Sequence, residues 1–250
     1  LKQTYKNFEL CLADASDSQH EYISEIVKKY QEKDKRIKFE KLKDNLGISE
    51  NTNSCRKMAK GEYLALLDHD DLLLPHALYS IAKIINEKDY DVFYSDEDHS
   101  YKGKRCRPFF KPDFNRDLMY SQMYICHLLC FKANLFDKIG GLRDKFNGSQ
   151  DYDLMLRLSE VTEEIYHIQD ILYTWRETEN STSINPNSKP YAHNAGKMAL
   201  EEHLKRRYGK DAYVLDSKFT FVFDPRYPIP KNQPMVSVII PTKDHCDLLR

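Results

Sequence analysis

The sequence predicts an α/β fold in which a mostly parallel sheet is flanked by helices, and three observations support this. Short apolar runs typical of strands alternate with segments of helical periodicity along most of the chain. The run at residues 63–67 is almost entirely apolar, as in a strand that is covered on both faces. A chain of 250 residues is long enough for one large domain or for a domain with an appendage.

The first elements show the alternation clearly. Residues 8–12 predict a short strand, because an apolar run there ends in a turn rich in Asp and Ser. Apolar side chains at positions 23, 26, 27 and 30 have helical spacing, which predicts an amphipathic helix with one buried face. A second strand is expected at residues 37–42. A polar helix is expected at residues 49–59, with Ser49 as its N-cap.

The later elements continue the pattern, with one irregular stretch. Pro75 opens a helix, and a strand is expected at residues 91–95. Residues 101–124 contain prolines and several aromatic residues without a clear period, so a surface loop or lid is expected there. Beyond it we expect a helix at 149–160, short strands at 165–168 and 171–175, and a long helix at 190–208.

The end of the chain changes in composition. Four prolines lie within residues 225–234, as in a stiff linker. We therefore expect a domain at residues 1–224, a linker at 225–235, and the opening strand and turn of a second domain at 236–250.

Composition excludes several classes of protein. The formal charge of −1 and the lack of a basic stripe give no attraction to nucleic acid. No apolar run approaches the roughly 20 residues needed to cross a bilayer, and the first residues do not show the basic and then apolar pattern of a signal peptide. The six cysteines form no CxxC pair, which favours reduced thiols. We expect a cytoplasmic location, with contact at the inner face of the membrane only through other parts of the protein.

The strongest chemical signal is the acidic run at residues 68–71. Asp68, Asp70 and Asp71 follow an apolar strand, at the edge where open α/β sheets bind ligands. Their mutual repulsion would be offset by a cation, and carboxylates suit Mn²⁺ or Mg²⁺ together with substrate phosphates. The alternative interpretation is a solvated Asp-rich turn before a helix that begins with proline.

Two further acidic groups are weaker signals. Asp151 opens a predicted helix. It would act either as a general base or only by interacting favourably with the helix dipole. The dipole would keep the carboxylate of Asp151 ionised. Asp96 and Glu97 end another predicted strand and would share the same sheet edge.

Several motifs, in order, resemble family 2 glycosyltransferases, which are inverting enzymes with the Rossmann-like GT-A fold. The likeness extends over residues 1–176 and is strongest for members that build bacterial surface polysaccharides, including rhamnosyl-type transferases. The motifs are Leu12 to Asp14, Asn45-Leu46-Gly47, residues 61–71, Ser95 to Asp98, residues 148–154 and Tyr173-Thr174-Trp175-Arg176.

The resemblance implies a role for each acidic group. Asp14 would contact the base or ribose of a UDP- or dTDP-sugar donor. Asp68 and Asp70, with Asp71, would hold the metal ion and the diphosphate. Asp151 would deprotonate a hydroxyl of a glycan or lipid-linked acceptor. Asp96 and Glu97 would line the donor-sugar or acceptor side of the site.

The sequence departs from the family in two places. Many members have a histidine ligand after the late Arg, whereas Thr178 stands at about that position here. The family's opening strand does not precede Leu1, yet residues 236–244 have its pattern. We therefore expect tandem transferase domains, and we expect residues 236–240 to fill the vacant strand position of their own chain or of a neighbour in a strand-swapped oligomer. Residues 1–250 on their own need not be catalytically active.

Two other functions remain open. A transferase fold that only binds glycan or serves as a scaffold would show the same motifs. A phosphohydrolase or nucleotidyltransferase is less favoured, because the sequence has only 8 glycines and no phosphate-binding glycine loop.

Overall fold

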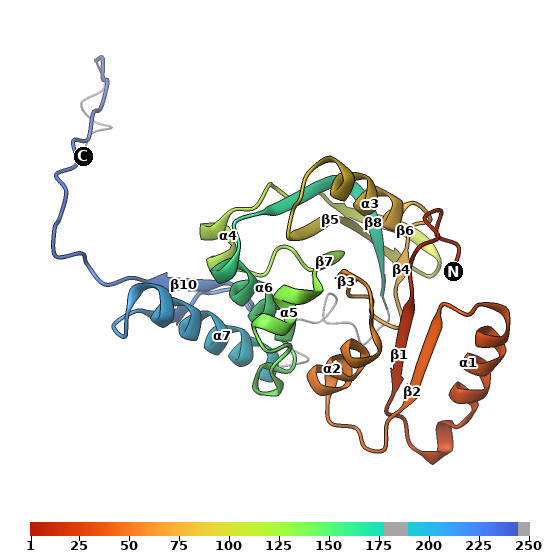
Figure 1. The fold of residues 1–250 in the computed structure, drawn as a ribbon. Coiled ribbons are helices and arrows are strands. Elements are labelled where there is room, and N and C mark those ends of the chain that lie inside the picture. Colours follow the sequence, from red (N-terminus) through yellow and green to blue (C-terminus); the bar gives the residue numbers. More distant parts are fainter. Residues whose placement is uncertain (178–189, 245–250) are drawn as a thin grey trace.

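The structure is a computed structural model that describes residues 1–177 and 190–244, and these residues form sheets flanked by helices (Figure 1). The α/β class is confirmed, but the main sheet is mixed, with the order β3-β7-β5-β8-β4 and with β6 on β5. Within it, only the pair β5–β8 is parallel. Its strands are β3 (Tyr63–Ala65), β4 (Leu72–Leu73), β5 (Val92–Tyr101), β6 (Lys104–Phe109), β7 (Leu129–Lys132) and β8 (Ile165–Glu177).

A second, two-stranded sheet lies beside the main one. It consists of the parallel strands β1 (Leu10–Asp14) and β2 (Ile37–Lys41), with α1 (Tyr22–Lys33) and α2 (Ile48–Met58) next to it. The buried face expected on α1 was wrong, since no residue of this helix is buried. Two strands make too narrow a surface to cover the helix.

The start of α2 also differs from the prediction. The helix follows Gly47, whose φ of 90° lies in the left-handed region that favours glycine. Ser49 lies inside the helix rather than at its cap, and its hydroxyl donates to Asn147 Oδ1 at 2.6 Å. This serine therefore joins α2 to the turn before α6.

Residues 101–124 are not a surface loop. They contain β6 and the short helix α4 (Arg116–Ser121), which is capped by Asn115. Met119 and Tyr120 are fully buried and belong to the main core. Tyr120 and Tyr124 of this stretch thus lie in the interior, whereas Phe109 and Phe110 are exposed.

The C-terminal half of the domain packs two long helices together. They are α6 (Gln150–Val161), which buries most of its residues, and α7 (Pro190–Tyr208), which lies where the periodicity predicted it. The two strands expected between them are one continuous strand, β8. The remaining elements are α3 (Ala77–Glu87), α5 (Ala133–Lys138), β9 (Tyr213–Asp216), β10 (Phe223–Arg226) and the 3-10 turns at Ser18–His20 and Asp144–Phe146.

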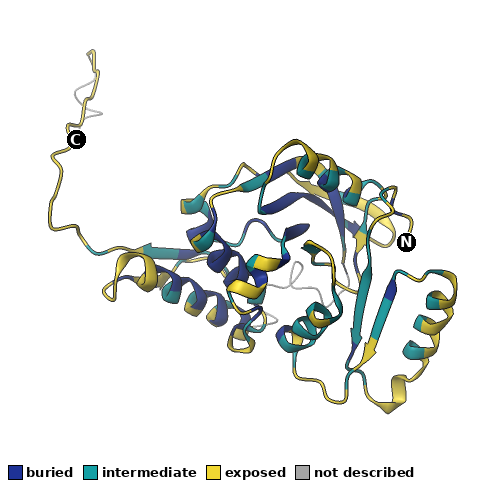
Figure 2. Ribbon diagram, in the orientation of Figure 1, coloured by how far each residue is buried: buried dark blue, intermediate teal, exposed yellow. Residues whose placement is uncertain are grey.

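The segment after β10 leaves the domain. Residues 227–244 contain no helix or strand, and the apolar residues from Val236 to Ile240 are exposed (Figure 2). The prediction that these residues fill a vacant position in their own chain is therefore not met in this structure. None of the described helices is long and apolar enough to cross a membrane.

One ion-pair group joins α6 to α7. His203 Nδ1 lies 2.6 Å from Glu160 Oε1, and Arg206 Nη2 donates to the same oxygen at 2.7 Å. Burial alone would raise the pKa of Glu160, but the hydrogen bonds from His203 and Arg206 outweigh it and lower this pKa from 4.5 to about 2. The ionised carboxylate thus stabilises the contact between the helices.

We expect Glu160→Gln to reduce the free energy of unfolding at pH 7 by about 1–2 kcal/mol, allowing for solvent screening. Because the folded pKa of Glu160 is lowered, this stabilisation is complete above about pH 4.5 and is lost as the pH falls toward 2. Urea unfolding at several pH values would measure it. Glu87→Gln, in an exposed pair with Lys83, is the control. An unchanged difference between wild type and Glu160→Gln down to pH 2.5 would contradict the expectation.

Candidate active site

The acidic run at residues 68–71 forms a turn between β3 and β4. β3 ends at Ala65 and β4 begins at Leu72. The Asp71 N–H donates to the Asp68 carbonyl at 3.2 Å, which closes the turn. The expectation that β3 is covered on both faces was wrong, since Ala65 is exposed.

Asp71 is the buried member of this turn. Its carboxylate accepts hydrogen bonds from the Tyr173 hydroxyl at 2.6 Å and from the Arg176 N–H at 2.8 Å. Burial raises the pKa of Asp71, and these two hydrogen bonds offset only part of that effect. Strand β8, which carries both donors, therefore fixes the position of the acidic turn.

His127 completes a group that could hold a metal ion. Its ring stacks on Tyr173 with a centroid separation of 4.6 Å and meets Trp175 edge-on. Its Nε2 atom lies 3.8 Å from Asp68 Oδ2. One ligand atom each from Asp68, Asp71 and His127 lies within 4.8 Å of the others.

The donor set of this group fits a divalent cation. Carboxylate oxygens suit Mn²⁺ and Mg²⁺, and an imidazole nitrogen is a common ligand of transition-metal ions. The two oxygens of Asp71 each accept one hydrogen bond and keep a lone pair for an ion. Asp70 is not a member of the group: its side chain is exposed, and its carbonyl accepts a hydrogen bond from Arg176.

Asp151, in the first turn of α6, lies at the same site. Its charge interacts with those of His127 and Asp68. Burial raises the pKa of Asp151, and the favourable interactions with His127 and the Tyr152 N–H offset this only in part. The helix dipole, which we expected to set the ionisation of Asp151, is therefore outweighed by burial. This charge interaction links two acidic motifs that are far apart in sequence.

The next acidic residue of this helix points elsewhere. Asp153 is buried and accepts hydrogen bonds from Arg157 at 2.7 Å and from Arg143 at 3.1 Å. The turn before the helix contains Gly148 at a φ of 95°, and a Cβ there would lie 2.9 Å from Ala192 Cβ on α7. Asp153 and Gly148 therefore hold the helix in place.

Asp96 lies inside a strand, not after one. β5 continues past the predicted end to Tyr101, so Asp96 and Glu97 are buried between neighbouring strands. The Lys111 N–H donates to Asp96 Oδ1 at 2.9 Å, and His167 Nε2 lies 2.8 Å from the same oxygen. Both contacts are to protein groups.

Glu97 acts on His127 through the backbone. Its Oε2 atom accepts a hydrogen bond from the His127 N–H at 2.9 Å and pairs with Lys111 Nζ at 3.2 Å. Lys111 Nζ donates in turn to the carbonyls of Ile125, at 2.5 Å, and of His127. The two charged side chains are 3% and 0% exposed, so this pair is shielded from water.

Asp14 ends β1 and has its own partners. Its carboxylate accepts hydrogen bonds from Lys41 Nζ and the Ser16 N–H, each at 2.9 Å. Burial would raise the pKa of Asp14, but these hydrogen bonds outweigh it and lower the pKa. The residue remains charged at the end of its strand, and its contacts are not with the aspartates of the 68–71 turn.

The histidine of the site comes from an unexpected part of the chain. Many members of the family that the sequence resembles have a histidine ligand after the late Arg. Thr178 stands at about that position here, and it lies outside the described residues. His127 stands just before β7 and follows no local pattern in the sequence. Only the fold brings it to the acidic turn, so sequence reasoning missed it.

Comparison with known proteins identifies relatives of this chain. Residues 1–139 match the family described as Glycosyl transferase family 2. Uncharacterized protein y4gI of Sinorhizobium fredii is 42% identical over 99% of this chain and 28% of its own length. O-antigen biosynthesis protein RfbC of Myxococcus xanthus is 36% identical over 99% of this chain and 19% of its own. The chain thus spans less than a third of either relative.

Solved structures share the fold. Staphylococcus aureus TarS 1–349 in complex with UDP-GlcNAc has a TM-score of 0.64 at 18% identity, over 82% of this chain and 60% of that one. The mannosyltransferase PcManGT from Pyrobaculum calidifontis, in complex with GDP-Man and Mn²⁺, has a TM-score of 0.53 at 14% identity, over 84% of this chain and 69% of that one. The expected GT-A fold is confirmed.

We expect His127→Ala to weaken Mn²⁺ binding at least about tenfold, since it removes one of the three grouped ligands. Titration of the protein with Mn²⁺, followed by the electron paramagnetic resonance signal of the free ion, measures the change. His76→Ala is the matched control, because His76 is exposed and pairs with Asp170 away from the acidic turn. Equal Mn²⁺ affinity of His127→Ala and wild type would contradict the expectation.

Proposed function

Because the chain belongs to glycosyl transferase family 2, we propose that it transfers a sugar from a nucleotide-diphosphate-sugar donor to a hydroxyl of a glycan or lipid-linked acceptor. The observation that carries this proposal is the group formed by Asp68, Asp71 and His127, together with the charge interactions of Asp151 with His127 and Asp68. Asp68, Asp71 and His127 suit a cation bound to a diphosphate. Asp151 suits the activation of an acceptor hydroxyl.

The donor is proposed to be a UDP- or dTDP-sugar. TarS has been solved with UDP-GlcNAc, which supports this class, although PcManGT was solved with GDP-Man. Asp14 is the residue we assign to the base or ribose, since it remains ionised at the end of β1. The acceptor is assigned to bacterial surface polysaccharide synthesis, which fits the likeness to RfbC.

A divalent ion, when bound by Asp68, Asp71 and His127, would neutralise the charge that develops on the leaving diphosphate. We keep Asp70 as a further candidate ligand, since it adjoins this group in the same turn. Ionised Asp151 takes the proton of the acceptor hydroxyl as that oxygen attacks the anomeric carbon. A new C–O bond forms while the bond to the diphosphate oxygen breaks, and its electron pair leaves with the diphosphate. A single displacement of this kind inverts the anomeric centre.

Asp96 and Glu97 are assigned a supporting role in this proposal. Both are buried, and their hydrogen bonds are to His167, Lys111 and the His127 backbone. We therefore assign them to holding the backbone of the site in place, without contact to the sugar. We also keep the proposal of a cytoplasmic location, at most peripheral to the membrane, which suits the free thiols of the five described cysteines.

We expect Asp151→Asn to lower transfer by about 10²–10⁴-fold while donor binding in the presence of Mn²⁺ stays within a fewfold of wild type. The physical reason is that the amide cannot accept the proton of the acceptor hydroxyl. The measurement is a screen of UDP-, dTDP- and GDP-sugars with and without Mn²⁺, for binding by calorimetry and for release of the nucleoside diphosphate.

The control is Asp144→Asn, an exposed aspartate just before α6, which should keep full activity. A wild-type chain that binds donor and glycan but releases no nucleoside diphosphate, with Asp151→Asn identical to it, would instead favour the non-catalytic glycan-binding or scaffolding domain.

A further inference from the structure

The hairpin formed by β5 and β6 projects from the main sheet, and we call residues 101–110 the hairpin segment. The last pair of the ladder is Tyr101 with Lys104. Between them, Lys102 and Gly103 have φ values of 50° and 77°, the left-handed conformation that a tight turn between twisted strands requires. A Cβ on Gly103 would have no atom within 4 Å. The tip of the hairpin therefore extends into open space.

The hairpin segment carries only positive charge. It contains basic side chains at positions 102, 104, 105 and 107 and no acidic residue. Every residue of β6 except Cys106 is exposed (Figure 2). These charges therefore face solvent rather than the core.

The two arginines of the segment are compensated, whereas the two lysines are not. Arg105 pairs with Asp98, and Arg107 pairs with Glu177. The two carboxylate side chains are 6% and 1% exposed, while those of the arginines are 53% and 56% exposed. Within residues 1–177 and 190–244, the lysines at the tip form no ion pair. The excess charge thus lies at the tip.

Large aromatic side chains lie in water next to these charges. Phe110 is 68% exposed, and Phe109 and Tyr101 are each 39% exposed. Basic side chains and Pro108 also protect an edge strand from pairing, which would explain the charge alone. Such protection does not require exposed phenylalanines. Exposed aromatic groups bordered by cations are typical of a surface that contacts a membrane.

The helix α1 offers an alternative apolar surface, with a less suitable charge. Tyr22, Ile26 and Tyr30 are exposed on it. Its lysines, however, are interspersed with Glu25 and Glu32, so that most of the charge of the helix cancels. The hairpin segment combines exposed aromatic groups with charge of one sign. Among these two surfaces, it is the one that complements an anionic partner.

We propose that the hairpin segment binds the surface of a membrane that contains anionic phospholipids. The lysines at the tip lie beside the lipid phosphates, and Phe110 inserts between the headgroups. Each lysine near such a surface strengthens binding about fivefold. The sequence alone predicted membrane contact only through other parts of the protein, whereas this proposal assigns it to the described domain.

The base of the hairpin adjoins the candidate site. The ring of His99 on β5 stacks on Trp175 with a centroid separation of 5.4 Å, and Trp175 in turn meets His127 edge-on at 5.6 Å. Docking of the hairpin would therefore bring the site to the membrane surface, where a lipid-linked acceptor is held. This last link rests on the proposed function, but the docking itself does not.

The first test is sedimentation of the chain with vesicles. We expect binding to vesicles of phosphatidylcholine with phosphatidylglycerol and none to phosphatidylcholine alone. Lys102→Glu with Lys104→Glu should weaken binding at least about tenfold. The control with the same change of charge is Lys138→Glu with Lys210→Glu, which should bind within about twofold of wild type.

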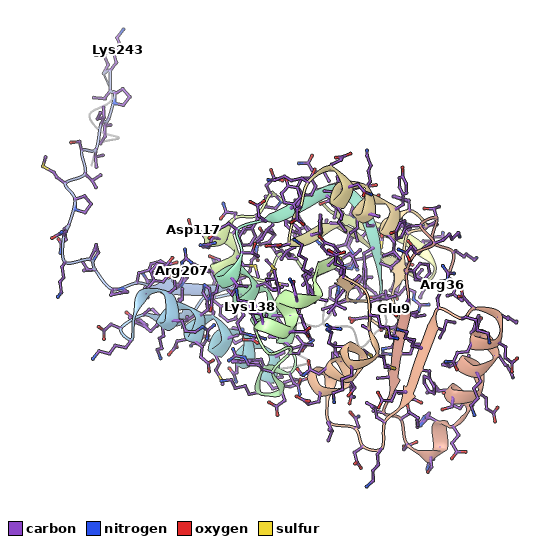
Figure 3. The ribbon with its side chains drawn as sticks, viewed as in Figure 1. Glu9, Arg36, Asp117, Lys138, Arg207 and Lys243 are labelled. Carbon is purple, nitrogen blue, oxygen red and sulfur yellow. The ribbon has the colours of Figure 1, made fainter. Side chains whose placement is uncertain are left out.

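Both control lysines are exposed. Lys138 ends α5, away from β6, and is labelled in Figure 3. Equal sedimentation of wild type with both kinds of vesicle overturns the proposal. So does a loss of binding in the control that equals the loss in the hairpin variant.

The second test concerns the aromatic contact. We expect Phe110→Ser to weaken vesicle binding about tenfold, because an apolar side chain no longer leaves water. Tyr30→Ser, on α1, should bind as wild type does. Unchanged binding of Phe110→Ser would mean that the hairpin attracts anions without docking on a membrane, which overturns the proposal. A loss in Tyr30→Ser alone would assign the contact to α1 and overturn it as well.

Failure of the docking can be distinguished from failure of the proposed function. The substituted side chains of the hairpin are exposed, so circular dichroism should show an intact fold in each variant. Transfer to a water-soluble acceptor should be equal in wild type and in Lys102→Glu with Lys104→Glu, because neither lysine belongs to the site. A chain that binds vesicles without transfer would contradict only the proposed reaction.

Discussion

The buried ion pair between Lys111 and Glu97 is the interaction on which the candidate site depends. Glu97 accepts the N–H of His127, and Lys111 donates to the carbonyls of His127, Ile125 and Ser95, so both backbone polar groups of His127 are held. The transfer of two charges from water to a protein interior is unfavourable unless the remaining donors and acceptors are satisfied. The carbonyls around Lys111 satisfy that condition. The histidine is therefore fixed by groups that do not themselves reach the site.

A single aromatic side chain, Tyr173, connects His127 to the acidic turn. The ring of Tyr173 stacks on His127, its hydroxyl donates to Asp71, and it accepts the N–H of Asp68 at 3.3 Å. Tyr173 lies on β8, which pairs in parallel with the strand that carries Glu97. Two adjacent strands thus position all three grouped ligands. Ligands fixed in this way lose little conformational freedom when an ion binds, which is the advantage of a preorganised site.

The sequence predicted what depends on local periodicity, and the long helix at 190–208 lies at its predicted bounds. The resemblance supplied a relation that no local pattern contains, because it assigned Asp68 and Asp151 to one site, and the charges of these two residues interact in the structure. It failed where partners distant in sequence decide the structure. Asp96 and Glu97 lie inside β5 because His167 and Lys111, which are 71 and 14 residues away, satisfy their charges. His127 was missed for the same reason, since its role exists only after the strands have paired.

The site concentrates carboxylates where water is scarce, and this has an energetic consequence. Burial raises the pKa values of both Asp71 and Asp151 in the folded chain. For an acid with a raised pKa, ionisation opposes folding: the cost is absent below the unfolded pKa and complete above the folded one. Above the folded pKa values of these two residues, the fold therefore carries a desolvation cost that the rest of the core must outweigh. A divalent cation or a diphosphate-bound ion between these groups would remove part of that cost, so the same charges that weaken the free domain favour the ligand.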